Sequence, residues 1–226
     1  MLQRRKTNAK RIAAMRRFAS ALADGAISCR VSALADRARV LVLCPIRREL
    51  QLGLFTSARD SFVDAGFPVS AVRRFQGIDL QNNRQRDGVH SASAVVTMSF
   101  LRGFVPKARA IWSTNPAVLY VFFAEDDCRF IGGVDVQAVL REAKAAGRCA
   151  GWMGYGLRNG QPKVGAHLLS FTKSALERFV MDLKHLVKQR VLALDTALHH
   201  LWLAGRIFLP AETLAQQAAH PLKRRR

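Results

Sequence analysis

The chain has 226 residues, of which 50% are hydrophobic, and this is enough for one α/β domain with a sizeable core. Its hydrophobic content excludes an intrinsically disordered protein, because disordered chains lack the apolar residues that form a core. The 36 Lys and Arg residues outnumber the 16 Asp and Glu residues and give a formal net charge of +20, which predicts a polyanionic partner, either nucleic acid or an anionic membrane surface.

The cysteines and the apolar runs bear on the cellular setting. Cys29, Cys44, Cys128 and Cys149 show neither paired metal-ligand spacing nor the pattern of a secreted disulfide framework. No apolar run approaches the roughly 18 residues that cross a bilayer, and the N-terminus has no hydrophobic signal core. We therefore expect reduced thiols, no transmembrane segment, and a cytoplasmic setting or a viral or nuclear compartment that contains DNA.

Residues 1–36 form a basic extension ahead of the domain. Between Arg4 and Arg17, basic residues are interleaved with apolar ones at helical spacing, which predicts a basic amphipathic helix. The helix could follow the phosphates of a nucleic acid, lie on a membrane surface, serve as an Arg-rich transit peptide, or simply cap the domain. The domain itself is expected over residues 37–220, with a basic tail at residues 221–226.

A strand, a helix and a second strand open the domain. Residues 39–45 predict the first core strand, and the apolar positions from Leu50 to Ala65 predict a helix that Gly66 closes. Val69 to Phe75 predict the second strand. Because a helix separates the two strands, this order predicts a parallel sheet. Residues 89–112 then carry a helical pattern that Pro106 interrupts.

The most hydrophobic stretch of the chain ends in three acids. Residues 117–124 are apolar and rich in β-branched and aromatic side chains, which predicts a fully buried strand of a parallel sheet. Glu125, Asp126 and Asp127 follow at once, at the end of a strand where α/β sheets bind ligands. If the backbone stays extended, Glu125 and Asp127 share one face. Carboxylates grouped in this way suit Mg²⁺ or Mn²⁺, and the alternative is a solvated turn.

The remaining elements continue the alternation of helices and strands. Val136 to Ala143 predict a helix that ends near Gly147, and residues 149–155 predict a strand. Another strand is expected up to Ser170. The helix after it has Ser174 and Glu177 at the spacing of a capping box.

Three segments, in this order, resemble glycosyltransferase family 25, which includes lipooligosaccharide and collagen galactosyltransferases. Phe-Ala-Glu-Asp-Asp-Cys-Arg-Phe at 123–130 resembles the acidic motif of GT-A glycosyltransferases in the form found in this family. Residues 164–176 resemble its Gly-Ala strand that ends in Ser before a helix. Residues 192–198 resemble its Pro-Val-Asp segment, with Ala193 in place of the proline. The resemblance covers roughly residues 39 to 220.

The resemblance implies a GT-A-like, Rossmann-like α/β fold with a mostly parallel sheet flanked by helices. It also implies transfer of a sugar from a nucleotide sugar, such as a UDP-sugar, to an acceptor hydroxyl. Asp127, with Glu125 as a second ligand, would hold Mn²⁺ or Mg²⁺, and Asp126 would belong to the donor-binding set. In one position the chain departs from the family, because Ser99-Phe100 stands where the family usually has a Ser-His pair.

Further site residues follow from the same resemblance. Pro45 and Arg47 would border the nucleotide, and Asp79 would lie near its base or ribose. Asp195 is the candidate carboxylate base that deprotonates the acceptor. The alternative for Asp195 is a structural one, in which it caps the helix that runs through His199 and His200.

The sequence is compatible with more than one acceptor and with more than one class of protein. The family resemblance implies a glycan, lipooligosaccharide or hydroxylysine acceptor, whereas the charge and the basic ends suit DNA that carries a hydroxymethylated base. A metal-dependent nuclease would also place carboxylates at a strand end beside a basic surface, but two-metal sites usually need more acids. A non-catalytic nucleic-acid-binding protein would explain the charge and leave the acidic cluster without a role.

Overall fold

A computed structural model describes most of the expected domain. The described residues are 35–44, 53–77, 92–130, 136–151, 156–158, 161–163, 168–208 and 215–217. Outside them lie the basic N-terminal extension up to residue 34, the basic tail, and the predicted nucleotide-binding residues Pro45, Arg47 and Asp79.

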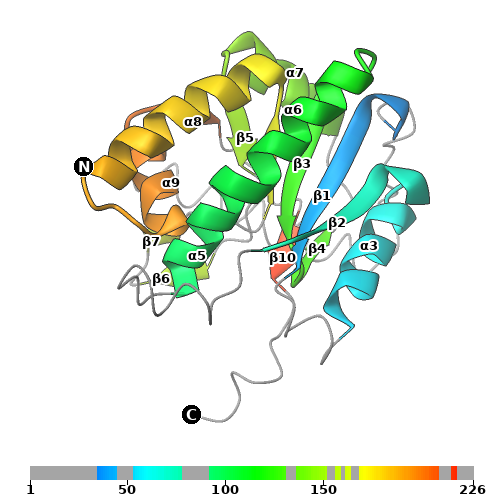
Figure 1. The fold of residues 1–226 in the computed structure, drawn as a ribbon, viewed down its shortest axis with the longest axis horizontal. Helices are drawn as coiled ribbons and strands as arrows, with labels where there is room; N and C mark the ends of the chain where they lie inside the picture. The colour runs from blue at the N-terminus through cyan, green and yellow to red at the C-terminus, as the bar shows by residue number, and fades with distance from the viewer. Residues whose placement is uncertain are drawn as a thin grey trace, which may run out of the picture.

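Among the described residues, six strands form one sheet in the order β2-β1-β3-β8-β5-β9 (Figure 1). They are β1 (Ala38–Cys44), β2 (Val72–Gln76), β3 (Tyr120–Glu125), β5 (Cys149–Gly151), β8 (Leu168–Phe171) and β9 (Ile207–Phe208). Strand β8 runs antiparallel to its neighbours β3 and β5, and the other pairings are parallel. The predicted fold class, an α/β protein with a mostly parallel sheet, is confirmed.

Strand β3 lies in the middle of this sheet, between β1 and β8. Its residues Val121, Phe122, Phe123 and Ala124 are completely buried, which confirms the buried strand expected from the apolar run. The strand begins later than expected, because the chain first makes a turn in which the Val118 amide donates to the Asn115 carbonyl at 3.1 Å.

Helices cover both faces of the sheet, as the apolar strands require. One face carries α5 (Ala92–Ser99), a π-helical turn (Phe100–Phe104), α6 (Val105–Thr114), α8 (Lys173–Lys188) and α9 (Leu194–Leu203). The other face carries α3 (Leu54–Asp64) and α7 (Val136–Ala145). Because strand side chains alternate, Leu41 and Leu43 of β1 pack in the first layer, and Val40 and Val42 pack in the second.

The helical pattern around Pro106 is not broken but changes pitch. Pro106 has no N–H to donate, and just before it the Val105 amide bonds to the Phe100 carbonyl five residues back, which forms the π-helical turn. Phe100 and Phe104 are fully buried and stack with their ring centroids 4.9 Å apart. The turn therefore lets one continuous helical segment carry two aromatic rings into the core.

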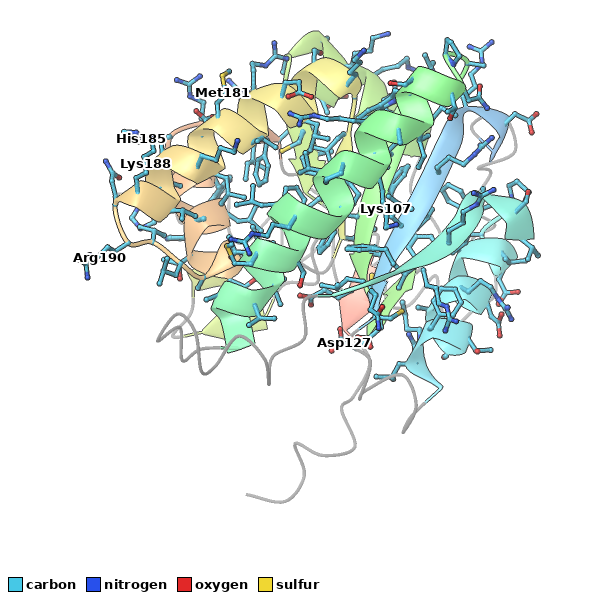
Figure 2. All side chains as sticks on the ribbon, in the orientation of Figure 1. Lys107, Asp127, Met181, His185, Lys188 and Arg190 are labelled. Carbon is cyan, nitrogen blue, oxygen red and sulfur yellow. The ribbon has the colours of Figure 1, made fainter. Side chains whose placement is uncertain are left out.

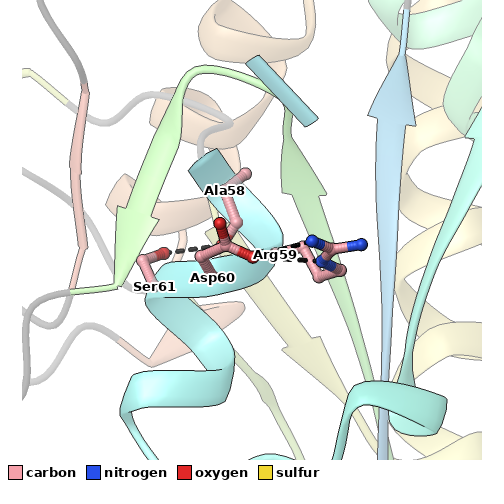
Figure 3. Close-up of polar contacts among 4 residues, drawn as sticks. All are labelled: Ala58, Arg59, Asp60 and Ser61. Carbon is pink, nitrogen blue, oxygen red and sulfur yellow. Dashed lines mark hydrogen bonds and ion pairs between the residues drawn. The ribbon is translucent and has the colours of Figure 1, made fainter. Parts of the chain in front are cut away.

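Helix α3 shows why this stretch folds as an amphipathic helix. Ala58 is buried against the sheet, whereas Arg59 and Asp60 face solvent and form an ion pair with 3.0 Å between Nη2 and Oδ1 (Figure 3). The Ser61 hydroxyl donates to the Ala58 carbonyl at 2.7 Å, as serine often does inside a helix. Gly66, at φ 100°, follows the helix and confirms its predicted end.

Helix α8 begins two residues earlier than the capping box at Ser174 and Glu177 predicts. Its N-cap is Thr172, whose Oγ1 accepts a hydrogen bond from the Ala175 amide at 3.2 Å. Ser174 already lies inside the helix. Glu177 does not complete a capping box, since its carboxylate forms a two-pronged ion pair with Arg109 of α6.

Two small two-stranded ribbons complete the described elements. One pairs β4 (Cys128–Phe130) with β10 (Ala215–Gln217), and the other pairs β6 (Gly156–Arg158) with β7 (Gln161–Lys163). In the first ribbon Gln217 lies opposite Cys128, so a segment near the C-terminus runs beside the strand that follows the acids. None of the described helices is both long and apolar enough to cross a bilayer.

Candidate functional site

The acidic residues form the turn at which the central strand ends. Strand β3 stops at Glu125, Asp126 and Asp127 make the turn, and β4 begins at Cys128. Figure 2 shows Asp127 at one end of the sheet. Because β1 and β3 are parallel and Leu43 pairs with Glu125, this end is the carboxyl edge of the sheet. The backbone does not stay extended through Asp127, so the strand alternation expected for the three acids is replaced by a turn.

Burial distinguishes this turn from a solvated one. Asp126 and Asp127 are each only 1% exposed, whereas Glu125 is partly buried. The alternative of a solvated turn is therefore wrong for both aspartates. A carboxylate loses much solvation energy on burial, so buried carboxylates are found where they are paired, hydrogen-bonded or bound to a cation.

The residues that follow the acids add a positive charge to the same turn. Arg129 donates from Nη1 to the backbone carbonyls of Asp126, at 3.3 Å, and of Cys128, at 2.9 Å. Arg129 had no predicted role in the site. Its position two residues after Asp127 was the only available signal, because the β3–β4 turn is what folds the guanidinium back.

Cys128 is next to the acids, but its thiol is unreactive at neutral pH. Burial raises the pKa of its thiol, and the negative charges of Asp127 and Glu125 raise it further. The thiol therefore stays protonated at neutral pH, and it is neither a nucleophile nor a thiolate ligand under these conditions. Its side chain is part of the core layer formed with α3 and α7.

The carboxylates of the acidic turn could supply some, but not all, of the ligands of a Mg²⁺ or Mn²⁺ ion. Among the described residues, no three His, Cys, Asp or Glu side chains converge on one point. Hard divalent cations are commonly held by one or two carboxylates together with the phosphates of a substrate. Asp127 with Glu125 or Asp126 could provide such a partial set, and a complete protein cage is not present in the described part of the chain.

Asp195 lies at the start of α9, on the same edge of the sheet as the acidic turn. Helix α9 leads through a short turn into β9, which is parallel to β5 and therefore starts at the amino edge. The helix thus runs from the carboxyl edge back to the amino edge. Its N-cap is Ala193, so Asp195 is not the cap residue that the structural alternative required. It lies in the first turn of the helix, partly buried.

Ser99 is a second polar residue that the structure places near this edge. It is 1% exposed, and a Cβ atom on Gly77, which follows β2, would lie 3.2 Å from its Oγ. The same Cβ would lie 3.0 Å from Cδ1 of Leu43, so Ser99 packs where β1 and β2 end. Phe100 next to it belongs to the core, which explains structurally why an apolar ring occupies this position.

Fold and site together define a mostly parallel α/β protein with buried aspartates at the carboxyl end of its central strand. The chain matches no model of a known protein family, and no curated protein matches it. Among solved structures, it is similar to a glycosyltransferase involved in the glycosylation of the major capsid of PBCV-1. The TM-score is 0.49 and the identity 8%, over 83% of this chain and 96% of that chain. Membership of glycosyltransferase family 25 stays a prediction.

Proposed function

We propose that the chain is a metal-dependent glycosyltransferase that moves a sugar from a nucleotide sugar to an acceptor hydroxyl. The observation that carries the proposal is the burial of Asp126 and Asp127, each 1% exposed, in the turn that ends the central strand. This is the position at which α/β sheets bind ligands. Acids are scarce in a chain with 16 of them against 36 Lys and Arg residues, so two buried at this one point call for a function.

The acidic turn has the chemistry for the donor side of such a reaction. Asp127, with Glu125 as a second ligand, would hold Mn²⁺ or Mg²⁺, which as a Lewis acid offsets the charge of a departing diphosphate. Arg129 adds a fixed positive charge at the same turn, where it is anchored to the Asp126 carbonyl. Asp126 completes the proposed donor-binding set. Pro45, Arg47 and Asp79 stay predictions for the nucleotide.

Asp195 is the proposed base on the acceptor side. Its carboxylate would accept the proton of the acceptor hydroxyl while the acceptor oxygen bonds to the anomeric carbon of the sugar. The bond from that carbon to the diphosphate breaks, and the nucleoside diphosphate leaves with the electron pair. The position of α9 supports this role, because the helix starts at the carboxyl edge of the sheet, which also carries the acidic turn.

The acceptor is proposed to be polyanionic, with a hydroxymethylated base in DNA as the specific candidate. The net charge of +20 supports this class of acceptor. The same charge would also suit an anionic glycan or lipid surface, and the presence or absence of label in DNA distinguishes these acceptors.

A donor screen tests the proposal. The full chain is incubated with labelled nucleotide sugars and Mn²⁺, with and without DNA that contains hydroxymethylated bases, and parallel samples contain EDTA. Metal-dependent hydrolysis of a donor, or label in DNA, supports a glycosyltransferase. Cleaved DNA with intact donors would replace the proposal with a nuclease. Intact donors and intact DNA throughout would leave a binding protein.

A further inference from the structure

A cavity of about 550 Å³ lies at the amino edge of the sheet, opposite the acidic turn. Arg148, Arg178 and Arg206 line it together with one carboxylate, Asp182. Since β3 has six residues and strands rise about 3.3 Å per residue, this edge is about 20 Å from the acidic turn. The cavity is therefore separate from the proposed glycosyltransferase site.

Arg148 and Arg206 each follow a glycine in a turn of the same type at the end of a helix. Helices α7 and α9 are each followed by the sequence Ala-Gly-Arg, and a strand begins immediately afterwards. Gly147 and Gly205 adopt left-handed φ values of 65° and 68°. The amide of Arg148 then bonds to the carbonyl of residue 143 at 2.9 Å, and the amide of Arg206 bonds to the carbonyl of residue 201 at 2.8 Å.

The sheet brings these two turns together. Cys149 of β5 pairs in parallel register with Ile207 of β9, so Arg148 and Arg206 precede equivalent positions on neighbouring strands. Neighbouring strands are about 4.8 Å apart, and like charges at such positions repel each other. The fold thus places two arginines side by side ahead of neighbouring strands, although the repulsion of their charges opposes this arrangement.

The third arginine converges on the same turns. Arg178 of α8 donates from Nη2 to the Gly147 carbonyl, and a Cβ atom on Gly147 would lie 3.1 Å from that nitrogen. Arg148 in turn extends towards the other turn, since a Cβ atom on Gly205 would lie 3.9 Å from its Nη2. A Cβ at position 147 would therefore meet both an unfavourable φ and the end of the Arg178 side chain.

The charges of the cavity are not balanced within the described structure. Among the described residues, none of the three arginines forms a salt bridge. Arg178 donates a hydrogen bond to the Gly147 carbonyl, which is neutral. Three guanidinium groups thus face one carboxylate. The buried ring of Phe179 and the side chain of Ala175 line the same cavity and give it an apolar part.

We propose that this arginine cavity is a second binding site, which takes a phosphate group. Guanidinium groups bind phosphate oxygens through two parallel hydrogen bonds, and a cavity of 550 Å³ has the size of a small-molecule site. The phosphate is either that of a free phosphorylated compound or that of a nucleic-acid backbone. The inference does not depend on the proposed glycosyltransferase activity, because it uses no residue of the acidic turn.

Titration calorimetry with the full chain tests the proposal. Pyrophosphate and a short single-stranded oligonucleotide are the probes, and EDTA is present so that no divalent cation at the acidic turn contributes. The variant Arg148→Gln/Arg206→Gln is expected to bind pyrophosphate about tenfold more weakly or worse, because it loses charge-assisted hydrogen bonds. The matched control Arg102→Gln/Lys107→Gln, which removes two exposed charges elsewhere, should bind like the parent chain.

The two probes separate the sources of the phosphate. Tight pyrophosphate binding without loss of oligonucleotide affinity in the arginine variant assigns the cavity to a free phosphorylated compound. Oligonucleotide binding that weakens in the variant and is displaced by pyrophosphate assigns it to a nucleic-acid backbone. Equal pyrophosphate affinity in the parent chain and the arginine variant overturns the proposal, as does the absence of saturable binding of both probes by the parent chain.

A second variant guards against misfolding. Arg148→Lys/Arg206→Lys keeps both charges but cannot form the two-pronged hydrogen bonds, so its pyrophosphate affinity should fall between those of the parent and the glutamine variant. The melting temperature of the parent chain should rise with pyrophosphate, and that of the glutamine variant should not. A lysine variant that is folded and binds as tightly as the parent would contradict the geometric part of the proposal.

Discussion

The hydroxyl of Thr97 in α5 donates a hydrogen bond to the backbone carbonyl of Leu192, at 2.7 Å and across 95 positions of the chain. Thr97 is only 1% exposed, whereas the acceptor residue Leu192 is 39% exposed, so the bond is partly buried. It attaches the segment that leads into α9 to the helix that carries Ser99. The start of α9, and with it Asp195, is thereby held against the carboxyl edge of the sheet.

The first prediction follows from this bond. Thr97→Val keeps the shape of the side chain but removes the donor, and we expect it to destabilise the fold by about 0.5–1.5 kcal/mol, the usual net contribution of a hydrogen bond. Thr97→Ser retains the hydroxyl and serves as the control. Urea unfolding measures both. A valine variant as stable as the serine variant would show that the hydrogen bond does not hold the segment.

Asp127→Asn tests the proposed cation site. The substitution keeps the size of a side chain that is 1% exposed but removes its charge, so the fold should keep its melting temperature or gain stability. Donor turnover with Mn²⁺ should be abolished, and EDTA should have the same effect on the parent chain. Asp60→Asn, at an exposed position of α3, is the matched control. Undiminished turnover in the Asp127 variant would remove Asp127 from the site.

Asp195→Asn separates a base from a helix-stabilising charge. Because Asp195 lies in the first turn of α9 and is not the N-cap, its loss of charge should cost only about 0.3–1 kcal/mol of interaction with the helix dipole. Transfer to the acceptor should fall by roughly 10²-fold or more, the usual contribution of a general base, while donor binding persists. Single-turnover transfer and donor titration measure the two effects. Full transfer in a well-folded variant would return Asp195 to a structural role.

Arg190 occupies a position that suits glycine. It follows α8 with a φ of 65°, and among the described residues it is the non-glycine residue with a positive φ. The same turn contains glycine after α7 and α9, at Gly147 and Gly205. Since a left-handed conformation costs a residue with a Cβ about 1–2 kcal/mol, Arg190→Gly should stabilise the fold by up to about 1 kcal/mol after the extra chain entropy of glycine is subtracted.

Arg190→Ala is the control for that change, because it also removes the exposed side chain seen in Figure 2 but keeps the Cβ. Thermal unfolding should place the glycine variant above both the alanine variant and the parent. A glycine variant that melts with or below the alanine variant would show that backbone strain at position 190 is not what limits stability.

The ion pair between Arg109 and Glu177 predicts a pH dependence. The Nε–Oε1 distance is 2.8 Å, and the hydrogen bond to Arg109 lowers the pKa of the Glu177 carboxyl. The stabilising contribution of the ion pair is therefore fully present above the pKa of glutamate in the unfolded chain, about 4.3. It is lost as the pH falls through the lower pKa that Glu177 has in the folded chain. The side chains of Arg109 and Glu177 are 48% and 41% exposed, so solvent screens the pair and the contribution should be no more than about 1 kcal/mol.

Glu177→Gln should accordingly be less stable than the parent chain at pH 7, and the difference should shrink as the pH falls below 4. Glu142→Gln, on the exposed side of α7, is the control and should show no comparable change. Urea unfolding over this pH range measures both. A difference that persists undiminished in strong acid would mean that Glu177 stabilises α8 by something other than its charge.

The sequence by itself determined the main helices and the central strands of the sheet, and which of their faces are buried; it did not predict the short strands β4, β6, β7 and β10. Apolar side chains at strand or helix spacing carry this information locally, as in the run from Val121 to Ala124 and in the series Leu54, Ala58 and Phe62. The position of the acids at the end of the central strand was readable for the same reason. Local signals were less reliable at helix starts: Thr172 and Ser174 both carry a hydroxyl, and the structure has Thr172 as the cap of α8.

Only the tertiary structure decided which residues meet. The burial of Asp126 and Asp127, the return of α9 to the carboxyl edge and the adjacency of Arg148 and Arg206 all depend on contacts between segments far apart in the chain. Strand order and register set these contacts, and they follow from the packing of both helix layers on one sheet. The periodicity within a short window of sequence carries no information about such packing. For this reason the sequence alone could not show that Arg148, Arg178 and Arg206, which are far apart in the chain, line one cavity.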